Sequence, residues 1–286
     1  MTRLTPDMIN DVPYAMNDRD LQLASSIGTD LKGLAYEALG LRANDLIMEG
    51  LMIASVPVTC GKSTISGFSE SVCAVVEHLG AHSFKTKKTD VAGLREALEA
   101  KADIIFMADD EEFVALNVRA GQVSNNTSST ALGYFTALRV AAGPLDGKAV
   151  LLIGAGRVGS CAADMLAAAR ARVTVIDSDM QRAEELVARH RSFRIESDLE
   201  KAVKEAPLIY NASPARIPGE WIMEGATVVS PGMPFSFDAE GLRKMGTLVH
   251  DPLQIGVAVM AVWSASMSSS RPVAPQNAQV AMEVIS

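Results

Sequence analysis

Short apolar runs alternate with longer amphipathic segments along most of the chain. Runs suited to buried strands cover residues 51–56, 103–107, 149–153, 172–176 and 208–211. The segments between them carry apolar residues at helical spacing. Because short connections between alternating strands and helices favour parallel sheets with right-handed crossovers, the pattern predicts an α/β fold.

Helical spacing also dominates residues 5–49, where Thr5 can cap a helix that has Pro6 in its first turn. We therefore expect a helical N-terminal segment ahead of the first α/β unit. Further strands are expected near residues 83–85, 226–230 and 247–250, and further helices at residues 66–79, 90–100, 131–141, 179–190, 198–206 and 254–266.

Four consecutive acids at residues 109–112 follow the strand at 103–107. Acidic side chains in a first turn are stabilised by the helix dipole, and Phe113 and Leu116 continue at helical spacing. This arrangement predicts a helix that begins at the acids.

A glycine motif follows the apolar run 149–153. Gly154 permits a tight turn, Gly156 lets a pyrophosphate approach the backbone, and Gly159 lets the next helix pack close to its strand. Asp177 ends the second strand, 18 residues after Gly159, where its carboxylate can accept hydrogen bonds from ribose hydroxyls and repel a 2′-phosphate. The unit therefore predicts a Rossmann-type domain that binds NAD in preference to NADP.

The residues expected to contact the dinucleotide lie in this motif and at the ends of the later strands. They are Gly154, Gly156, Arg157, Val158, Gly159, Asp177, Asn211, Ser213, Pro214, Pro231 and Gly232.

Changes in composition divide the chain. A Gly- and Pro-containing stretch at residues 143–147 indicates a domain boundary. We expect a small α/β substrate and catalytic domain at residues 1–143 and a Rossmann NAD domain at residues 144–270. Residues 271–286 are poor in large apolar side chains, so a flexible tail is expected there.

The charge balance narrows the range of partners. A formal net charge of −8 leaves no basic face for nucleic acid and mildly favours a cationic substrate. Three cysteines show no metal-ligand spacing and suit a reducing cytoplasm, so no metal site and no disulfide are expected. No apolar stretch is long enough for a signal core or a membrane span, so a cytoplasmic protein without membrane contact is expected. A homodimer is compatible with these features.

Two carboxylates stand directly after strands, where open α/β sheets bind ligands. Asp109 follows the run 103–107, and Asp251 follows the strand near 247–250. Each is equally suited to cap the next element or to anchor a substrate. Among the four histidines, only His250 lies near the expected nicotinamide, and none shows metal-ligand spacing.

Several motifs, in their order and spacing, resemble the pyrrolysine synthase family across nearly the whole chain. They are residues 4–6 (LTP), 30–33 (DLKG), 56–59 (VPVT), 107–110 (MADD), 125–126 (NN), the glycine motif, and Pro231, Gly232 and Pro234. The resemblance implies a substrate in which 3-methylornithine is joined to the lysine side chain. It also implies NAD-dependent oxidation of the terminal amine carbon to a semialdehyde, followed by ring closure to pyrrolysine.

The chemistry requires a carboxylate, because the cationic nitrogen must be held or deprotonated before hydride leaves its carbon. Asp109 and Asp251 are the expected catalytic pair, one from each domain. The resemblance further implies that Leu4, Thr59 and Asn126 bind substrate. The chain departs from the family pattern at Asp251, where the family has a glutamate.

Two other readings fit the same two-domain pattern. One is a related NAD(P) dehydrogenase similar to the dipicolinate synthase A subunit or to methylenetetrahydrofolate dehydrogenase. The other is a non-enzymatic NAD-sensing module, for which substitution of Asp109 would change neither substrate binding nor rate.

Overall fold

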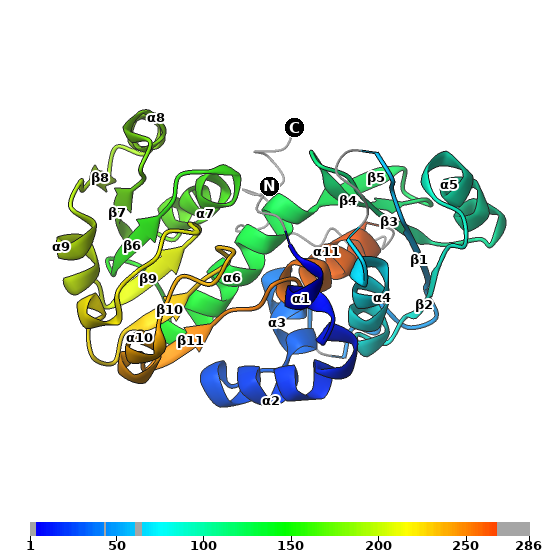
Figure 1. Cartoon of the computed structure of the whole chain (residues 1–286), viewed down its shortest axis with the longest axis horizontal. Coiled ribbons are helices and arrows are strands. Elements are labelled where there is room, and N and C mark those ends of the chain that lie inside the picture. The colour runs from blue at the N-terminus through cyan, green and yellow to red at the C-terminus, as the bar shows by residue number, and fades with distance from the viewer. Residues whose placement is uncertain (1–3, 43, 61–64, 268–286) are drawn as a thin grey trace.

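The computed structural model describes residues 4–42, 44–60 and 65–267. Two β-sheets lie at opposite ends of an elongated molecule, and a long central helix runs between them (Figure 1). Within the described residues, no helix is long and apolar enough to cross a membrane.

The first sheet has the strand order β2-β1-β3-β4-β5. Its strands are β1 (Met52–Val56), β2 (His82–Lys85), β3 (Ile104–Ala108), β4 (Phe113–Asn117) and β5 (Gln122–Asn125). Strand β1 pairs in parallel with β2 and β3, whereas β4 pairs antiparallel with both β3 and β5. The parallel part is the α/β unit that the apolar runs predict, and the two antiparallel strands extend it.

The helix predicted to begin at residues 109–112 is wrong. These residues form the turn between β3 and β4, and the segment after them is a strand. Phe113, Ala115 and Asn117 are buried while the residues between them are less so. This alternation has a period of two, which is the strand period, and the acids serve the turn instead of a helix dipole.

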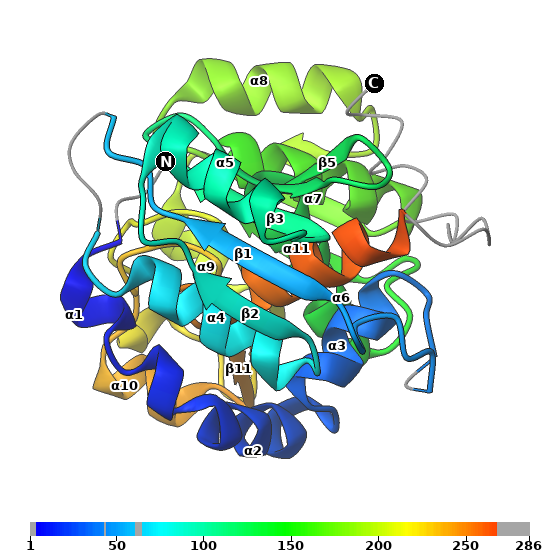
Figure 2. The same cartoon turned by 90° about the vertical axis from the view of Figure 1, so that its right-hand side faces the viewer.

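Helices cover both faces of the first sheet (Figure 2). On one face, α5 packs its Leu94 and Ala97 against Val56 and Ile105. On the other face, α4 and the late helix α11 (Gln254–Ser266) bury the opposite side chains of the same strands. The helices of this half are α1 (Pro6–Ile9), the 3₁₀ turn η1 (Val12–Tyr14), α2 (Met16–Ile27), α3 (Leu31–Ala38), α4 (Phe68–His78) and α5 (Asp90–Glu99).

The central helix α6 (Asn126–Ala142) begins earlier than the sequence pattern indicates. The side chain of Asn125 accepts a hydrogen bond from the Ser128 amide at 2.9 Å and so caps the helix at its first turn. Helix α6 contacts elements of both sheets, so it forms a shared spine.

The second sheet is fully parallel, with the order β11-β10-β9-β6-β7-β8. The strand order reverses between β6 and β9, which is the switch point at which such folds bind dinucleotides. Strands are β6 (Ala149–Ile153), β7 (Arg172–Ile176), β8 (Arg194–Ile195), β9 (Leu208–Asn211), β10 (Thr227–Val229) and β11 (Thr247–Val249), and helices are α7 (Arg157–Ala168), α8 (Met180–Arg189), α9 (Leu199–Lys204), the 3₁₀ turn η2 (Gly219–Trp221), α10 (Ala239–Lys244) and α11 (Gln254–Ser266).

Helix α11 follows the second sheet in sequence but packs against α6, α3, α4 and the strands β4 and β5. Two glycines let α6 and α11 approach closely. A Cβ on Gly133 would lie 2.4 Å from Ile255 Cγ2, and a Cβ on Gly256 would lie 2.6 Å from Thr130 Oγ1. The two helices therefore meet backbone to side chain, and one continuous apolar core spans both halves.

The predicted α/β class is confirmed, with a helical N-terminal region and a Rossmann-type second half. The division at residues 143 and 144 stays a prediction. The predicted tail at residues 271–286 lies outside the described residues.

Candidate active site

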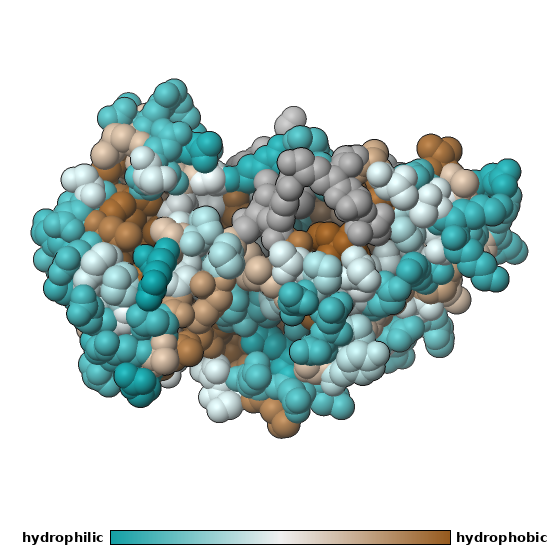
Figure 3. Space-filling model, in the orientation of Figure 1, coloured by the Kyte–Doolittle hydropathy of each residue, from teal (hydrophilic) through white to brown (hydrophobic). Residues whose placement is uncertain are grey.

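A cleft of about 1160 Å³ lies where the carboxyl ends of strands from both sheets face each other. Its walls include the residues that follow β1, β3, β6, β9, β10 and β11. On the face shown in Figure 3, hydrophobic residues lie in the hollows between mostly hydrophilic ridges. The volume exceeds what one small substrate needs, so the cleft can take a cofactor and a substrate together.

The glycine turn has the geometry that the sequence predicts. Gly154 has φ +96°, and its amide donates to the Ile176 carbonyl at 2.8 Å. A Cβ on Gly159 would lie 1.9 Å from the Gly154 carbonyl oxygen, so only glycine fits where α7 meets its strand. By contrast, no heavy atom of the described residues lies within 4 Å of a Cβ built on Gly156.

The open space at Gly156 faces the amino end of α7, which has no side-chain cap. Backbone N–H groups of a helix's first turn need partners, and phosphate oxygens supply them. These residues therefore fit the pyrophosphate of a dinucleotide, with Val158 also lining the cleft.

Asp177 follows β7 and holds the glycine turn. Its Oδ2 accepts a hydrogen bond from the Ala155 amide at 2.6 Å, and its Oδ1 accepts one from the Asp179 amide at 2.8 Å. Each carboxylate oxygen can accept a further bond, so this loop anchor can also accept ribose hydroxyls.

Asn211 is fully buried, and its side chain joins three loops. Its Nδ2 donates to Ser230 Oγ at 3.2 Å and to Ser236 Oγ at 3.0 Å, and its Oδ1 accepts from the Ser213 amide at 3.1 Å. A Cβ on Gly232 would lie 2.2 Å from the Ser213 carbonyl oxygen. Asn211, Ser213 and Gly232 thus fix the floor of the cleft, while Pro214 and Pro231 line it.

Arg157, the first residue of α7, reaches across the cleft to the other wall. Its Nη1 donates to the Glu111 carbonyl oxygen at 2.9 Å and lies 3.8 Å from Glu112 Oε1. Arg157, a residue of the glycine motif, therefore links the two walls of the cleft.

Asp109 lies in the turn between β3 and β4 and lines the cleft. Its Oδ1 accepts hydrogen bonds from the amides of Glu111 and Glu112, each at 2.8 Å. These bonds, that from Glu112 first, lower the pKa of the Asp109 carboxyl below its usual value. The side chain is therefore a fixed negative charge, which suits it to hold a cation.

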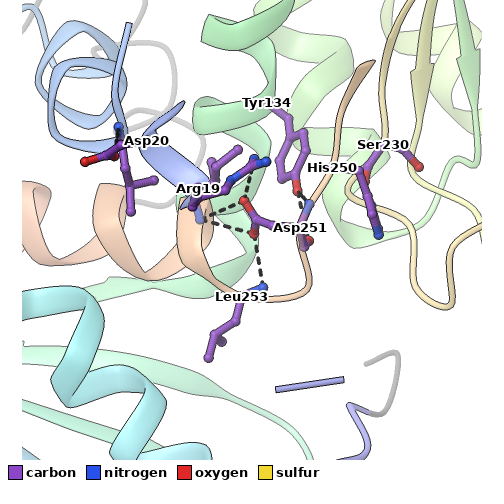
Figure 4. Close-up of polar contacts among 9 residues, drawn as sticks. Arg19, Asp20, Tyr134, Ser230, His250, Asp251 and Leu253 are labelled. Atoms are coloured by element: carbon purple, nitrogen blue, oxygen red, sulfur yellow. Dashed lines mark hydrogen bonds and ion pairs between the residues drawn. The ribbon is translucent and has the colours of Figure 1, made fainter. Parts of the chain in front are cut away.

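Asp251 also lines the cleft, but its carboxylate is occupied (Figure 4). Oδ2 forms a buried ion pair with Arg19 Nη2 at 2.9 Å, and Oδ1 accepts from the Leu253 and Ile255 amides at 3.1 and 3.2 Å. The Asp251 backbone exchanges hydrogen bonds with the Tyr134 hydroxyl. Asp251 thus joins α2 to the start of α11, and its charge is balanced by arginine.

The three expected substrate residues are not all brought together. Leu4 and Asn126 line the cleft with Asp109. Thr59 does not line it, because its hydroxyl and amide both bond the carboxylate of Asp90 at the start of α5.

Arg19 and Tyr134 are the residues that the sequence did not reveal. Arg19 lies on an amphipathic helix, and the sequence pattern predicts that its charged side chains face solvent. Tyr134 lies in an apolar helix, and the pattern predicts only a core position for it. His250, by contrast, does not line the cleft. Its Nδ1 lies 2.6 Å from the Ser230 carbonyl oxygen, and burial lowers the pKa of its ring.

Within the described residues, no group of three or more His, Cys, Asp or Glu side chains could hold a metal ion.

Comparison with known proteins places both halves of the chain. Residues 8–124 match the family model of the N-terminal domain of the pyrrolysine biosynthesis protein PylD, and residues 137–220 match that of shikimate/quinate 5-dehydrogenase. Shikimate 5-dehydrogenase of Thermus thermophilus, solved with NADP(H) and shikimate, is 21% identical and covers 82% of this chain and 99% of its own, with a TM-score of 0.51. That likeness shows the fold.

Two relatives align over far more than one domain. Pyrrolysine synthase of Methanosarcina acetivorans is 32% identical over 265 residues, covering 91% of this chain and 98% of the relative. Pyrrolysine synthase of Methanosarcina barkeri is 32% identical over 266 residues, covering 91% and 97%. Because this identity extends across both walls of the cleft, the chain belongs to the pyrrolysine synthase family.

Proposed function

We propose that this protein is an NAD-dependent dehydrogenase that completes pyrrolysine. Its substrate is 3-methylornithine joined to the lysine side chain, and it oxidises the carbon that bears the terminal amine. The observation that carries the proposal is the alignment with pyrrolysine synthases over 91% of the chain, a span long enough to include the acidic turn (residues 109–112), α6 and the glycine motif.

The reaction consumes no net water, because one water is taken up and one is released. The terminal amine loses a proton, its carbon loses a hydride, and water converts the resulting imine to an aldehyde with release of ammonia. The α-amine of the ornithine part then attacks the aldehyde and a second water leaves, which closes the pyrroline ring. The bound nicotinamide supplies the hydride acceptor.

Asp109 holds the substrate ammonium. Its pKa is lowered by two amides, so it is a weak base and a persistent anion at neutral pH. It therefore anchors the cationic nitrogen more effectively than it removes a proton, and turnover depends on the population of free amine.

An apolar wall of the cleft lies beside the turn that carries Asp109. Phe113 follows the acidic turn and packs edge to face on Phe68, with ring centroids 5.0 Å apart, and Leu4 lines the same cleft. This wall suits the methylene chain of the lysine part. Asn126 offers an amide to the substrate amine or carboxylate.

Asp251 acts as a positioning residue in this proposal. Paired with Arg19, it fixes the start of α11 beside Asn126. A direct catalytic role for Asp251 stays a prediction. A direct role would require the carboxylate to leave the arginine.

A preference for NAD over NADP is part of the proposal, because a carboxylate at the end of the second strand of a Rossmann unit repels a 2′-phosphate. The Thermus thermophilus shikimate dehydrogenase was solved with NADP(H), whereas the quinate dehydrogenase of Corynebacterium glutamicum was solved with NAD, so proteins of this fold bind either dinucleotide. We therefore assign the preference of this chain for NAD to Asp177 and the residues beside it.

The decisive assay follows NADH formation when the methylornithine–lysine conjugate is added to protein and NAD. Mass spectrometry of the product distinguishes pyrrolysine from the open semialdehyde. Shikimate and free lysine serve as control substrates, and NADP serves as control cofactor. Turnover of shikimate but not of the conjugate would refute the proposed substrate, as would cofactor binding without any turnover of the conjugate.

A further inference from the structure

The contact between Arg157 and the acidic turn joins two sites that the proposed function keeps separate. Arg157 begins α7, directly after Gly156, where the residues fit a pyrophosphate. Its guanidinium nevertheless lies on the opposite wall, 2.9 Å from the Glu111 carbonyl oxygen. One side chain therefore belongs to the glycine motif by position and to the substrate wall by contact.

The acidic turn is held from two sides. From within, the Asp109 carboxylate accepts the amides of Glu111 and Glu112. From across the cleft, the guanidinium of Arg157 bonds the Glu111 carbonyl and lies 3.8 Å from the Glu112 carboxylate. Arg157 thus places a positive charge beside the four consecutive acids of residues 109–112.

The present partners of Arg157 are weak competitors for a guanidinium. The Glu112 contact is long, and both side chains are about 60% exposed, at 60% for arginine and 59% for glutamate. Exposed pairs of this kind contribute little. A pyrophosphate carries more charge and accepts paired N–H donors from arginine, so it is the stronger partner.

We infer that Arg157 couples the dinucleotide site to the substrate site. A pyrophosphate bound at Gly156 draws the guanidinium away from Glu111 and Glu112, and the turn that carries Asp109 keeps its full negative charge. The substrate ammonium then binds more tightly after the dinucleotide than before it. The inference rests on the proposed dinucleotide and amine ligands and adds an order of binding to them.

The chain offers a matched control for Arg157. Arg182 also lines the cleft and is 59% exposed, but it pairs with Asp179 at 3.2 Å on its own side of the cleft. Removing Arg182 changes the charge of the cleft by the same amount as removing Arg157, without touching the acidic turn.

The first test uses backbone amide signals in NMR spectra, with NADH as a ligand that does not turn over. The Glu112 amide nitrogen is bonded to the Glu111 carbonyl, so its chemical shift reports the loss of the arginine hydrogen bond. NADH is expected to move this signal in the wild type toward its position in ligand-free Arg157→Met. Arg157→Met should show little further movement, and Arg182→Met should respond as the wild type does.

The second test titrates the conjugate calorimetrically with and without NADH. Binding should be about fivefold tighter with NADH in the wild type and in Arg182→Met. In Arg157→Met the two affinities should agree within about twofold. Bound NADH that leaves the Glu112 signal in place would overturn the inference, as would loss of the coupling in Arg182→Met. A Glu112 signal that moves while the conjugate fails to bind would instead refute the proposed substrate, while showing that the dinucleotide does draw Arg157 away from the turn.

Discussion

The carboxylates at the strand ends each support a turn before they can serve a ligand. Asp109 accepts the amides of its own hairpin turn, and Asp177 accepts the amide of Ala155 in the glycine turn. Each of these carboxylates therefore caps a turn and still has oxygen lone pairs with which it can bind a ligand. Substitutions at these positions must separate charge from hydrogen-bond acceptance to be informative.

Asp109→Asn achieves that separation, because the amide oxygen can still accept the Glu111 and Glu112 amides. We expect kcat/KM for the conjugate to fall about 10- to 100-fold, the loss of one charge-assisted hydrogen bond. Thermal unfolding should show little change in stability at neutral pH.

A further prediction concerns the pH dependence of kcat/KM in the wild type and in Asp109→Asn. The hydrogen bonds from the Glu112 and Glu111 amides lower the pKa of the Asp109 carboxyl, so this group stays ionised at neutral pH. Any stability from that shift is lost only as the pH falls through the lowered pKa. The wild-type kcat/KM should therefore rise with pH as the substrate amine deprotonates, and the midpoint should be the same in Asp109→Asn. A midpoint that moves with the substitution would show that Asp109 itself titrates in turnover.

Asp177 calls for a pair of variants. Asp177→Asn keeps an acceptor for the Ala155 amide but removes the charge, so it should raise the affinity for NADP relative to NAD by about tenfold. Asp177→Ala should relax this preference too, and in addition weaken both cofactors because the glycine turn loses its anchor. Fluorescence titration of NADH and NADPH measures both effects. An unchanged ratio in Asp177→Asn would remove the carboxylate from cofactor selection.

At the scale of elements, apolar runs predicted β1, β3, β6 and β9 well, because these parallel strands are buried along most of their length. The hairpin of β4 and β5 escaped prediction, since acids followed by Phe113 and Leu116 match a helix start as well as a turn and a strand. Local sequence could not decide between them; the pairing of β4 with β3 does, because it buries Phe113 and Ala115 together. Strand β8 has only two residues, too few to form a pattern.

The crossing of α6 and α11 positions Asn126 and depends on Gly256. In Gly256→Ala, the new methyl group would lie 2.6 Å from Thr130 Oγ1 and 2.9 Å from Asn126 Oδ1. We expect a loss of about 1–3 kcal/mol in the free energy of unfolding and weaker binding of the conjugate. Urea unfolding and calorimetry measure the two effects.

A double variant checks this cause. Thr130→Ala removes the nearer clashing atom, so Thr130→Ala with Gly256→Ala should recover part of the stability lost by Gly256→Ala alone. Strictly additive losses would mean that the crowding lies elsewhere.

Over the whole molecule, the buried pair of Arg19 and Asp251 ties the N-terminal helices to the end of the second sheet. Both side chains are less than 10% exposed, at 7% and 4%. Removing one partner leaves a buried charge alone, so Arg19→Met should cost about 3–5 kcal/mol of unfolding free energy. Asp251→Asn with Arg19→Met should cost less than Arg19→Met alone, because no charge is then left unpaired.

Urea unfolding of the single and double variants tests this pair. A loss below about 1 kcal/mol in Arg19→Met would indicate that water reaches the carboxylate.

The candidate site was partly predictable at this scale. Strand order along the chain places Asp109 and the glycine motif at strand ends, which meet at one cleft once the sheets face each other. The partner of Asp251 was not predictable, because Arg19 lies 232 positions away on a helix that no pattern docks there. Long-range pairing of this kind is fixed by tertiary packing, which a single sequence does not reveal.

The packing of α11 has a consequence for biosynthesis of the chain. Strands β4 and β5 and helices α3 and α4 receive this helix, although more than a hundred residues of the second sheet are translated before it. During translation, the apolar face of the first half that α11 covers therefore stays exposed until the Rossmann half has been synthesised. The order of folding on the ribosome would then run against the order of synthesis: the half made second can close its sheet first, and the half made first matures only when residues 254–266 emerge.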